Sequence, residues 1–248
     1  MKKVQKALLV LLRAGVWESK IEDLSGFPLS AGEWKNLYLL SRQQTVTGIV
    51  FQGIQHLPEH FLPAEELLVR WMAETDAIER KNMQMNKVLD LLVQWFTESG
   101  VQPVLQKGQG IASLYENPLL RECGDIDFYF DSRQMFEKAF SLIRQCGLRG
   151  KVQADQSVTY AWKGVEVEHH TCLLDLHNPF LQRYAKELEQ QYGYNHMSLE
   201  GGQDVRIPSP VLNLLLQSLH ILKHALGWGI GLRQLCDMAR SCYKLHDE

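Results

Sequence analysis

Two aspartates at alternate positions of a short apolar segment are the residues best placed for chemistry. The segment 125–130 reads DIDFYF. Side chains of an extended strand alternate between faces, so Asp125 and Asp127 share one face and the alternate apolar residues share the core side. Two carboxylates about 7 Å apart repel by roughly 2 kcal/mol at an effective dielectric near 20. A Mg²⁺ ion removes that repulsion, and its other usual ligands are water and substrate phosphates. The pair therefore indicates metal-dependent transfer from a nucleotide.

A second acidic strand is predicted at 164–170, which reads GVEVEHH. On this strand Glu166, Glu168 and His170 share one face. If the strand lies beside segment 125–130, a third carboxylate joins the two aspartates. Three carboxylates can bind two divalent ions, and one of them can take the proton from an attacking hydroxyl. We assign the third position to Glu168 and keep Glu166 as the alternative, because the sequence gives no strand register.

Basic side chains near these carboxylates could bind phosphates. Lys107 lies beside Gly108, just before a helix predicted at 109–116, and both an ammonium and a helix N-terminus favour anions. Arg121 could add a bidentate phosphate contact. Both residues precede the aspartate segment in the chain. They are therefore candidates for holding a triphosphate.

The predicted helix 209–226 carries two stripes. Its core stripe consists of Leu212, Leu215, Leu216, Leu219 and Leu222, and its polar stripe of Asn213, Gln217, His220 and His224, with Lys223 alongside. One interpretation turns His220, Lys223 and His224 toward a triphosphate or an acceptor. The other is an ordinary solvent-exposed face. On the next helix Arg233 and Asp237, one turn apart, predict an exposed salt bridge.

The spacing of apolar residues, which predicts the helices and strands that position these residues, changes along the chain. Residues 1–99 predict helices at 2–14, 31–56 and 63–99, the last ended by Ser99-Gly100. The middle of the chain predicts strands at 103–106, 126–130, 158–162 and 165–169, helices at 109–116 and 132–146, and a Lys163-Gly164 hairpin turn. A helix at 180–192, a strand at 204–207 and two helices within 210–246, broken at the glycine-rich segment 227–231, complete the pattern.

This order of elements predicts an α+β fold with a small central mixed β-sheet flanked by N-terminal and C-terminal helices. We divide the sequence into an N-terminal helical region at 1–99, an α/β core at 100–208 and a C-terminal helical region at 209–248. The chain of 248 residues, 45% hydrophobic, is long enough for a large core.

Composition narrows the classes of partner. A net charge of −3, from 26 basic and 29 acidic residues, does not predict a binding face for long nucleic acid. Five scattered cysteines without a Cys-x-x-Cys pair favour reduced thiols and a cytoplasmic location. The apolar run at 7–12 predicts an amphipathic helix rather than a signal peptide. No run approaches the roughly 20 apolar residues of a membrane span, so we expect a soluble protein without a membrane partner.

The ordered motifs resemble a known family. Leu105-Gln106-Lys107-Gly108, Tyr115, Arg121, Gly124-Asp125-Ile126-Asp127, Glu168-His169-His170 and a helix bearing His220 and His224 follow one another between about 100 and 240. This order is similar to the uncharacterised bacterial nucleotidyltransferase-like family, within the superfamily that includes DNA polymerase beta and the aminoglycoside nucleotidyltransferases. The superfamily usually has Gly-Ser at the glycine turn, where this chain has Lys107-Gly108, and the spacing to the first aspartate is longer here.

The resemblance implies transfer of a nucleoside monophosphate from a nucleoside triphosphate such as ATP to an unknown hydroxyl acceptor, with Mg²⁺ or Mn²⁺. A small hydroxyl compound, a protein side chain and an RNA end all remain open as the acceptor. The implied catalytic and metal-binding residues are Asp125, Asp127 and Glu168. The candidate substrate-binding residues are Lys107, Gly108, Arg121, His170, His220, Lys223 and His224.

Two other functions are compatible with the same sequence. The fold could be catalytically inactive and use its N-terminal helices to bind a protein, or it could be the regulatory partner in a toxin–antitoxin pair. A zinc site at His169, His170, Cys172 and His177 is disfavoured, because adjacent histidines on a strand point in opposite directions and no zinc-ligand spacing is present. No P-loop and no Gly-x-Ser-x-Gly elbow occurs. The glycines at 227–231 follow a helix rather than a strand, which argues against dinucleotide binding.

Overall fold

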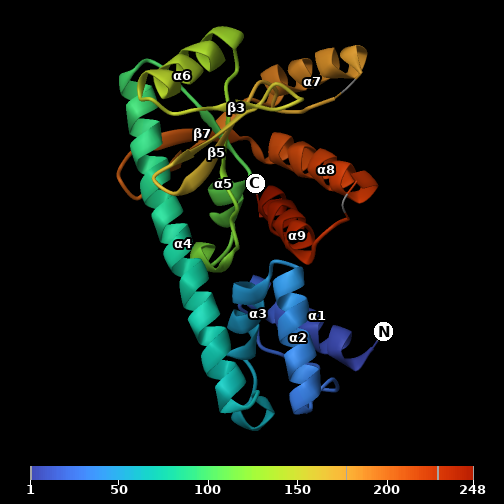
Figure 1. Ribbon diagram of the computed structural model, residues 1–248. Coiled ribbons are helices and arrows are strands. Elements are labelled where there is room, and N and C mark those ends of the chain that lie inside the picture. The colour runs from blue at the N-terminus through green and yellow to red at the C-terminus, as the bar shows by residue number, and fades with distance from the viewer. Residues whose placement is uncertain (1, 177, 228, 248) are drawn as a thin grey trace. The chain divides into compact units, whose positions relative to one another are not determined.

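The computed structural model describes residues 2–176, 178–227 and 229–247 (Figure 1). His177 and Trp228 lie outside the described residues, and so do the parts of the zinc and glycine-break interpretations that involve them. The chain divides into two compact units. Unit 1 comprises Met1–Asn82, Ala112–Glu122 and Ile230–Arg240, and unit 2 comprises Met83–Ile111, Cys123–Gly229 and Ser241–Glu248. The three sequence regions at 1–99, 100–208 and 209–248 stay a prediction.

Unit 1 is helical. It contains α1 (Lys3–Trp17), α2 (Ala31–Gln43), α3 (Thr47–Ile54), η1 (Glu59–Phe61), η2 (Pro118–Leu120) and parts of α4 (Glu65–Glu98) and α9 (Leu232–Asp247). Helices α1 and α3 cross at two glycines. A Cβ on Gly15 would lie 1.8 Å from the carbonyl oxygen of Ile49, and one on Gly53 would lie 1.9 Å from that of Leu11. Only glycine allows the two backbones to approach this closely.

The single helix predicted at 31–56 is wrong, because the chain turns between α2 and α3. Thr45 has a φ of 51°, in the left-handed region that ends a helix. A carboxylate from a distant part of unit 1 then begins the next helix, since Glu122 Oε1 accepts a 2.8 Å hydrogen bond from the backbone N–H of Thr47. The apolar period runs through the break, so the periodicity alone did not indicate it.

Unit 2 is built on a seven-stranded mixed sheet in the order β3-β4-β5-β2-β1-β7-β6. Its strands are β1 (Val104–Gln106), β2 (Ile126–Tyr129), β3 (Lys151–Val152), β4 (Val158–Trp162), β5 (Val165–His170), β6 (Tyr194–Ser198) and β7 (Asp204–Pro208). The pairs β2–β5 and β1–β7 are parallel, and the other neighbours are antiparallel. The α+β fold class with a central mixed sheet and flanking helices is therefore confirmed.

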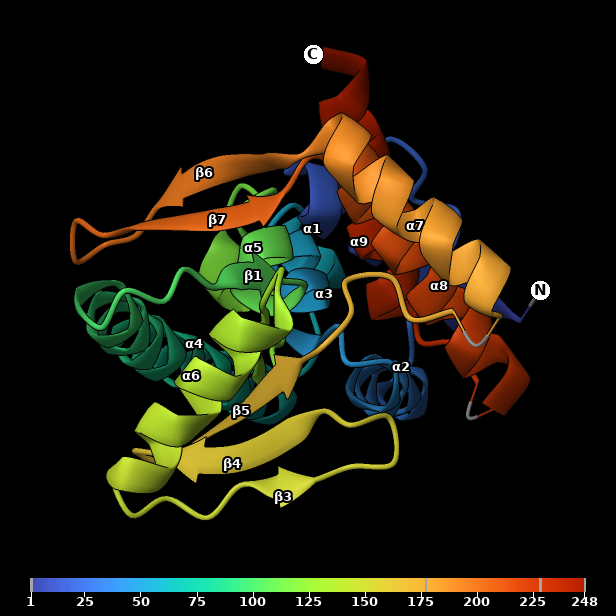
Figure 2. The same ribbon diagram turned by 90° about the horizontal axis from the view of Figure 1, so that it is seen from above.

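The sheet of unit 2 is covered on both faces (Figure 2). On one face the C-terminal part of α4 and α6 (Arg133–Gln145) pack, as Phe96 makes edge contacts with Phe128 and Phe130. On the other face α7 (Pro179–Tyr192) and α8 (Pro210–Gly227) bury a cluster that includes Val104, Tyr129 and Leu212. The expected alternation in β2 is thus observed, with Phe128 and Asp127 on opposite faces.

Several local predictions hold and others do not. The hairpin between β4 and β5 has Lys163 at φ 49° and Gly164 at φ 80°, as a two-residue hairpin turn requires. The helix predicted at 109–116 is α5 (Gly108–Ala112), only five residues long. Strands β3 and β6 were not predicted, because most of their residues are exposed and they lack an apolar alternation. In the described residues, no helix has the length and apolar content needed to span a membrane.

Candidate functional site

The parallel pairing of β2 with β5 sets the geometry of the candidate site. Asp127 is the register partner of Glu168, and Tyr129 is the partner of His170. Glu168 and His170 are two residues apart on β5 and therefore project from the same face as Asp127. The register thus selects Glu168 rather than Glu166, which is exposed, as the residue opposite Asp127.

Three side chains converge on this face, and we call Asp127, Glu168 and His170 the Asp–Glu–His cluster. One ligand atom from each lies within 4.8 Å of the other two. The Nε2 atom of His170 is 2.7 Å from Asp127 Oδ1 and 3.6 Å from Glu168 Oε2. Ser157 fixes the other oxygen of Glu168, since its hydroxyl donates a 2.6 Å hydrogen bond to Oε1. The cluster brings two carboxylates and one imidazole nitrogen together.

Lys107 supplies a positive charge to the cluster from a strained turn. Its Nζ is 3.5 Å from Asp127 Oδ1. Lys107 and Gly108 both have positive φ, of 48° and 37°. A Cβ on Gly108 would lie 3.2 Å from the carbonyl oxygen of Asp125, so glycine lets the turn pass close to the strand that carries the aspartates. This turn directs the ammonium of Lys107 to the acidic face.

Burial and neighbouring charges shift the pKa values of the titratable groups at this site. Burial raises the pKa of Asp125 to about 6, and the negative charge of Asp127 adds to that shift. Burial also acts to raise the pKa of Asp127, but the Lys107 ammonium and the hydrogen bond from His170 outweigh it and lower that pKa. Burial disfavours the charge on Lys107, yet the three nearby carboxylates raise its pKa overall. Asp127 and Lys107 are therefore both charged at neutral pH.

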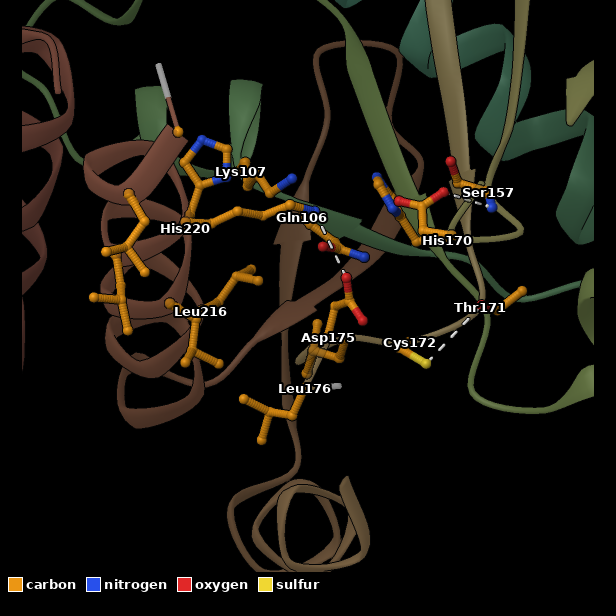
Figure 3. Close-up of a pocket in the computed structure, with 17 residues that line it drawn as sticks. Gln106, Lys107, Ser157, His170, Thr171, Cys172, Asp175, Leu176, Leu216 and His220 are labelled. Carbon is orange, nitrogen blue, oxygen red and sulfur yellow. Dashed lines mark hydrogen bonds and ion pairs between the residues drawn. The ribbon is translucent and has the colours of Figure 1, made fainter. Parts of the chain in front are cut away.

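A cavity of about 480 Å³ opens beside the cluster. Lys107 and His220 line one side of it and His170 and Ser157 lie across from them (Figure 3). Lys223 also lines the cavity and lies 3.6 Å from Asp175. Apolar walls come from α8 and from the segment after β5, formed by Leu173, Leu176, Leu216, Leu219, Leu222 and Leu226. The cavity thus joins a polar, charged end to an apolar wall.

The two adjacent histidines of β5 have opposite surroundings, as the alternation of the strand requires. His169 is fully buried against Phe96 and Phe130, and its Nε2 pairs with the hydroxyl of Tyr160 at 2.9 Å. Burial lowers its pKa to about 3, so it is neutral at physiological pH. His170 instead faces the carboxylates. The expectation that these residues point in opposite directions is confirmed.

Arg121 has a partner within unit 1. Its Nη2 is 2.7 Å from Asp237 Oδ2 and its Nε is 3.1 Å from Asp237 Oδ1, while the Tyr115 hydroxyl donates to the same carboxylate at 2.8 Å. We call these three residues the Arg121 cluster. Asp237 is buried, so the predicted exposed Arg233–Asp237 salt bridge is wrong. Arg233 donates instead to the carbonyl oxygen of Glu122 at 2.7 Å.

Helix α8 separates its two stripes less cleanly than its sequence predicts. Leu222, assigned to the core stripe, is 54% exposed, and Gln217, assigned to the polar stripe, is buried and donates to Ser241 at 2.6 Å. His220 lines the cavity, and the ring of His224 lies on that of His220 with centroids 4.4 Å apart. Asp125 is not among the three cluster residues. Its assignment as a metal ligand stays a prediction, and so do those of Asp127 and Glu168. The substrate-binding assignments also stay predictions, for Lys107, Gly108, Arg121, His170, His220, Lys223 and His224.

The polar residues at the site that the sequence analysis missed include Ser157 and Gln106. Ser157 precedes β4 and orients Glu168, but a lone serine after a turn carries no signal in the sequence. Gln106 lines the cavity and is the register partner of Asp127 on β1. Its side chain is buried, and its Nε2 has no hydrogen-bond partner among the residues that the structure describes. The place of Gln106 directly before Lys107, in a strand of apolar residues, was the available signal.

The donor set of the Asp–Glu–His cluster fits a divalent cation. Carboxylate oxygens and a neutral imidazole are ordinary ligands of such ions. The ammonium of Lys107 donates a long hydrogen bond of 3.5 Å to the buried Asp127 carboxylate. Asp127, Glu168 and His170 are therefore the residues that would hold an ion here.

Comparison with known proteins gives one family and one solved structure. A family model described as an uncharacterised nucleotidyltransferase matches residues 30–248. A crystal structure of an antigenic nucleotidyltransferase-like protein from Paracoccidioides brasiliensis is similar at 16% sequence identity and a TM-score of 0.43, covering 63% of this chain and 74% of that chain. A search of curated proteins gives no match.

Proposed function

The chain belongs to the uncharacterised nucleotidyltransferase family, and from this premise we propose that it transfers a nucleoside monophosphate from a nucleoside triphosphate to a hydroxyl acceptor with a divalent cation, Mg²⁺ or Mn²⁺. One observation carries the proposal. The parallel register places Asp127 directly beside Glu168, with Lys107 at the same face and a cavity adjoining them. The wider relationship to the DNA polymerase beta superfamily belongs to this proposal.

Each residue has a proposed task. Asp127, Glu168 and His170, with Asp125 nearby, would hold the cation, which would supply charge stabilisation at the phosphates. Glu168 would take the proton from the acceptor hydroxyl, whose oxygen forms a bond to the α-phosphorus as the bond to the leaving pyrophosphate breaks. Ser157 keeps the other oxygen of Glu168 in place. Lys107, His220 and Lys223 face the cavity and neutralise the charge of the triphosphate there. The five-residue α5 is too short to contribute an anion site of its own.

The decisive experiment joins binding to transfer. The protein is titrated with Mg²⁺ or Mn²⁺ and each nucleoside triphosphate while its unfolding midpoint is followed. At 100 times the dissociation constant, binding adds about 2.7 kcal/mol, which raises the midpoint by several degrees. The double variant Asp125→Asn/Asp127→Asn should lose this rise. Label from an α-labelled nucleoside triphosphate should appear on an acceptor from a small-molecule extract or on protein, and the double variant should lower that rate at least about 100-fold.

The matched control is Asp131→Asn, which removes a carboxylate just after β2 that pairs with Arg206 and is outside the cluster. It should keep both the metal-dependent rise and the transfer. If no nucleotide raises the midpoint of the unmodified protein and no label is transferred, the enzymatic proposal is wrong. An inactive protein-binding module, or a toxin–antitoxin partner, would then account for the family fold.

A further inference from the structure

The ligand atoms of the Asp–Glu–His cluster differ in kind from an all-carboxylate site, and this difference bears on which metal binds. Of the three residues, His170 contributes a nitrogen. Its Nε2 lies 2.7 Å from Asp127 Oδ1 and 3.6 Å from Glu168 Oε2. Neighbouring ligands of an octahedral ion with bonds of about 2.1 Å lie about 3 Å apart. The nitrogen therefore lies near a ligand's place relative to both carboxylates. To bind an ion it would give up the N–H that it donates to Asp127, with the imidazole in its other tautomer, protonated at Nδ1.

The position of His170 follows from the strand and does not depend on a mobile loop. It is the last residue of β5, two residues after Glu168 on the same face, and Tyr129 of β2 is its register partner. Its side chain is 16% exposed and lines the cavity, and its Nε2 contacts the Asp127 carboxylate behind it. A rigid strand pair thus presents one nitrogen and two oxygens to a single point.

The neighbouring residues favour the same arrangement. Ser157 binds Glu168 Oε1, which leaves Oε2 as the oxygen that faces His170. A hydrogen bond to the distal oxygen of a carboxylate is a common way to orient a metal ligand. His169, next in the chain, cannot take this part because it is buried on the opposite face and bonded to Tyr160. Only one of the two histidines therefore serves the cluster.

A nitrogen ligand makes a metal site more selective between hard and first-row transition ions than carboxylates alone do. Mg²⁺ is a hard cation that takes oxygen ligands and keeps several waters. First-row transition ions accept imidazole nitrogen beside carboxylates. We propose that His170 Nε2 is a metal ligand of this site and that it makes the site selective for a first-row transition ion such as Mn²⁺ over Mg²⁺. This inference rests on the proposed function for its biological meaning, but not for its test.

The test measures metal binding without any nucleotide. Mn²⁺ bound to the full chain is examined by electron paramagnetic resonance with pulsed detection of nitrogen coupling, and Mn²⁺ and Mg²⁺ affinities are measured by calorimetry. We expect nitrogen coupling to bound Mn²⁺ and an affinity for Mn²⁺ at least about tenfold above that for Mg²⁺. The His170→Asp variant should lose the coupling and lower the Mn²⁺-to-Mg²⁺ affinity ratio at least about tenfold.

Two further variants keep the experiment decisive. His170→Asn removes the imidazole without adding a charge, and it replaces His170→Asp if that variant does not fold. His196→Asn, on the exposed strand β6, is the matched control and should keep the coupling. Absence of nitrogen coupling at saturating Mn²⁺, absence of Mn²⁺ binding, or coupling that persists in both His170 variants would overturn the inference.

Transfer assays on the same samples separate the two ideas. If the unmodified protein shows nitrogen coupling that depends on His170 but transfers no nucleotide with any metal, the proposed function fails and the metal assignment stands. If transfer proceeds and bound Mn²⁺ shows no nitrogen coupling, the metal assignment fails and the proposed function stands.

Discussion

Two basic residues that the sequence marks as phosphate ligands, Lys107 and Arg121, have different surroundings. Arg121 makes two contacts of 2.7 and 3.1 Å with Asp237, which also accepts from Tyr115. Lys107 lies 3.5 Å from Asp127 and lines a cavity. The Arg121 guanidinium forms a bidentate ion pair with a buried carboxylate and so stabilises the fold. The Lys107 ammonium makes one longer contact and can still bind a substrate. The difference suggests that Arg121 is structural and Lys107 functional.

The largest expected effect separates these two residues by stability. Arg121→Met leaves the buried Asp237 charge without its cation and should lower the free energy of unfolding by about 3–5 kcal/mol. Lys107→Met should cost less than half as much, because His170 still donates to Asp127 and the side chain of Lys107 is 21% exposed. Urea unfolding of both variants measures the two losses.

A divalent cation should increase the difference in stability between the two variants, because an ion bound at Asp127 would replace the charge lost with Lys107. Saturating Mn²⁺ should reduce the deficit of Lys107→Met relative to the unmodified protein and leave the deficit of Arg121→Met unchanged. Equal deficits for the two variants, with or without Mn²⁺, would show that both pairs are structural.

The adjacent residues His169 and His170 on β5 also contrast a structural with a functional side chain. The structural part of this contrast can be tested through the pH dependence of stability. The pKa of His169 is about 3 in the folded protein and about 6.5 when unfolded. Between these values the unfolded chain binds the proton and the folded protein does not, so stability from this residue is complete above pH 6.5 and falls as pH decreases. From pH 7 to pH 5 the loss is about 2 kcal/mol.

The His169→Gln variant keeps a hydrogen-bonding group for Tyr160 but does not titrate. Its free energy of unfolding should therefore fall about 2 kcal/mol less than that of the unmodified protein between pH 7 and pH 5, measured by urea unfolding at each pH. Parallel pH profiles for the two proteins would contradict the neutral, buried state of His169.

The sequence predicted the parts of the site that depend on local periodicity. Alternation in DIDFYF and in GVEVEHH placed Asp127 opposite to Phe128 and His170 on the same face as Glu168, and both placements are observed. The choice between Glu166 and Glu168 could not be derived, because strand register is set by tertiary packing. The choice depended on the pairing of β2 with β5, which are neighbours in the sheet but have β3 and β4 between them in the sequence.

Contacts between distant parts of the sequence were beyond local patterns. Asp237 was matched with Arg233 because they lie one helical turn apart, yet its partner Arg121 is 116 residues away. The turn after α2 likewise depends on Glu122, 75 residues from Thr47. Sequence spacing predicts which side chains are neighbours on a helix. It does not predict a side chain from a distant part of the chain that binds the same group instead.

The smallest expected effect concerns Lys223, which combines features of both basic residues. It lies 3.6 Å from Asp175, but the two side chains are 67% and 42% exposed, and exposed pairs contribute little stability. Lys223→Ala should therefore leave the unfolding midpoint nearly unchanged.

Because Lys223 lines the cavity, its loss should remove one charge-assisted contact with a phosphate and raise the KM for the nucleoside triphosphate up to about tenfold, with kcat little affected. Steady-state kinetics at low and high salt measure both constants, and the KM difference should shrink as salt screens the charge. A fall in kcat at unchanged KM would instead place Lys223 with Lys107 at the reacting phosphates, and a lowered midpoint would place it with Arg121.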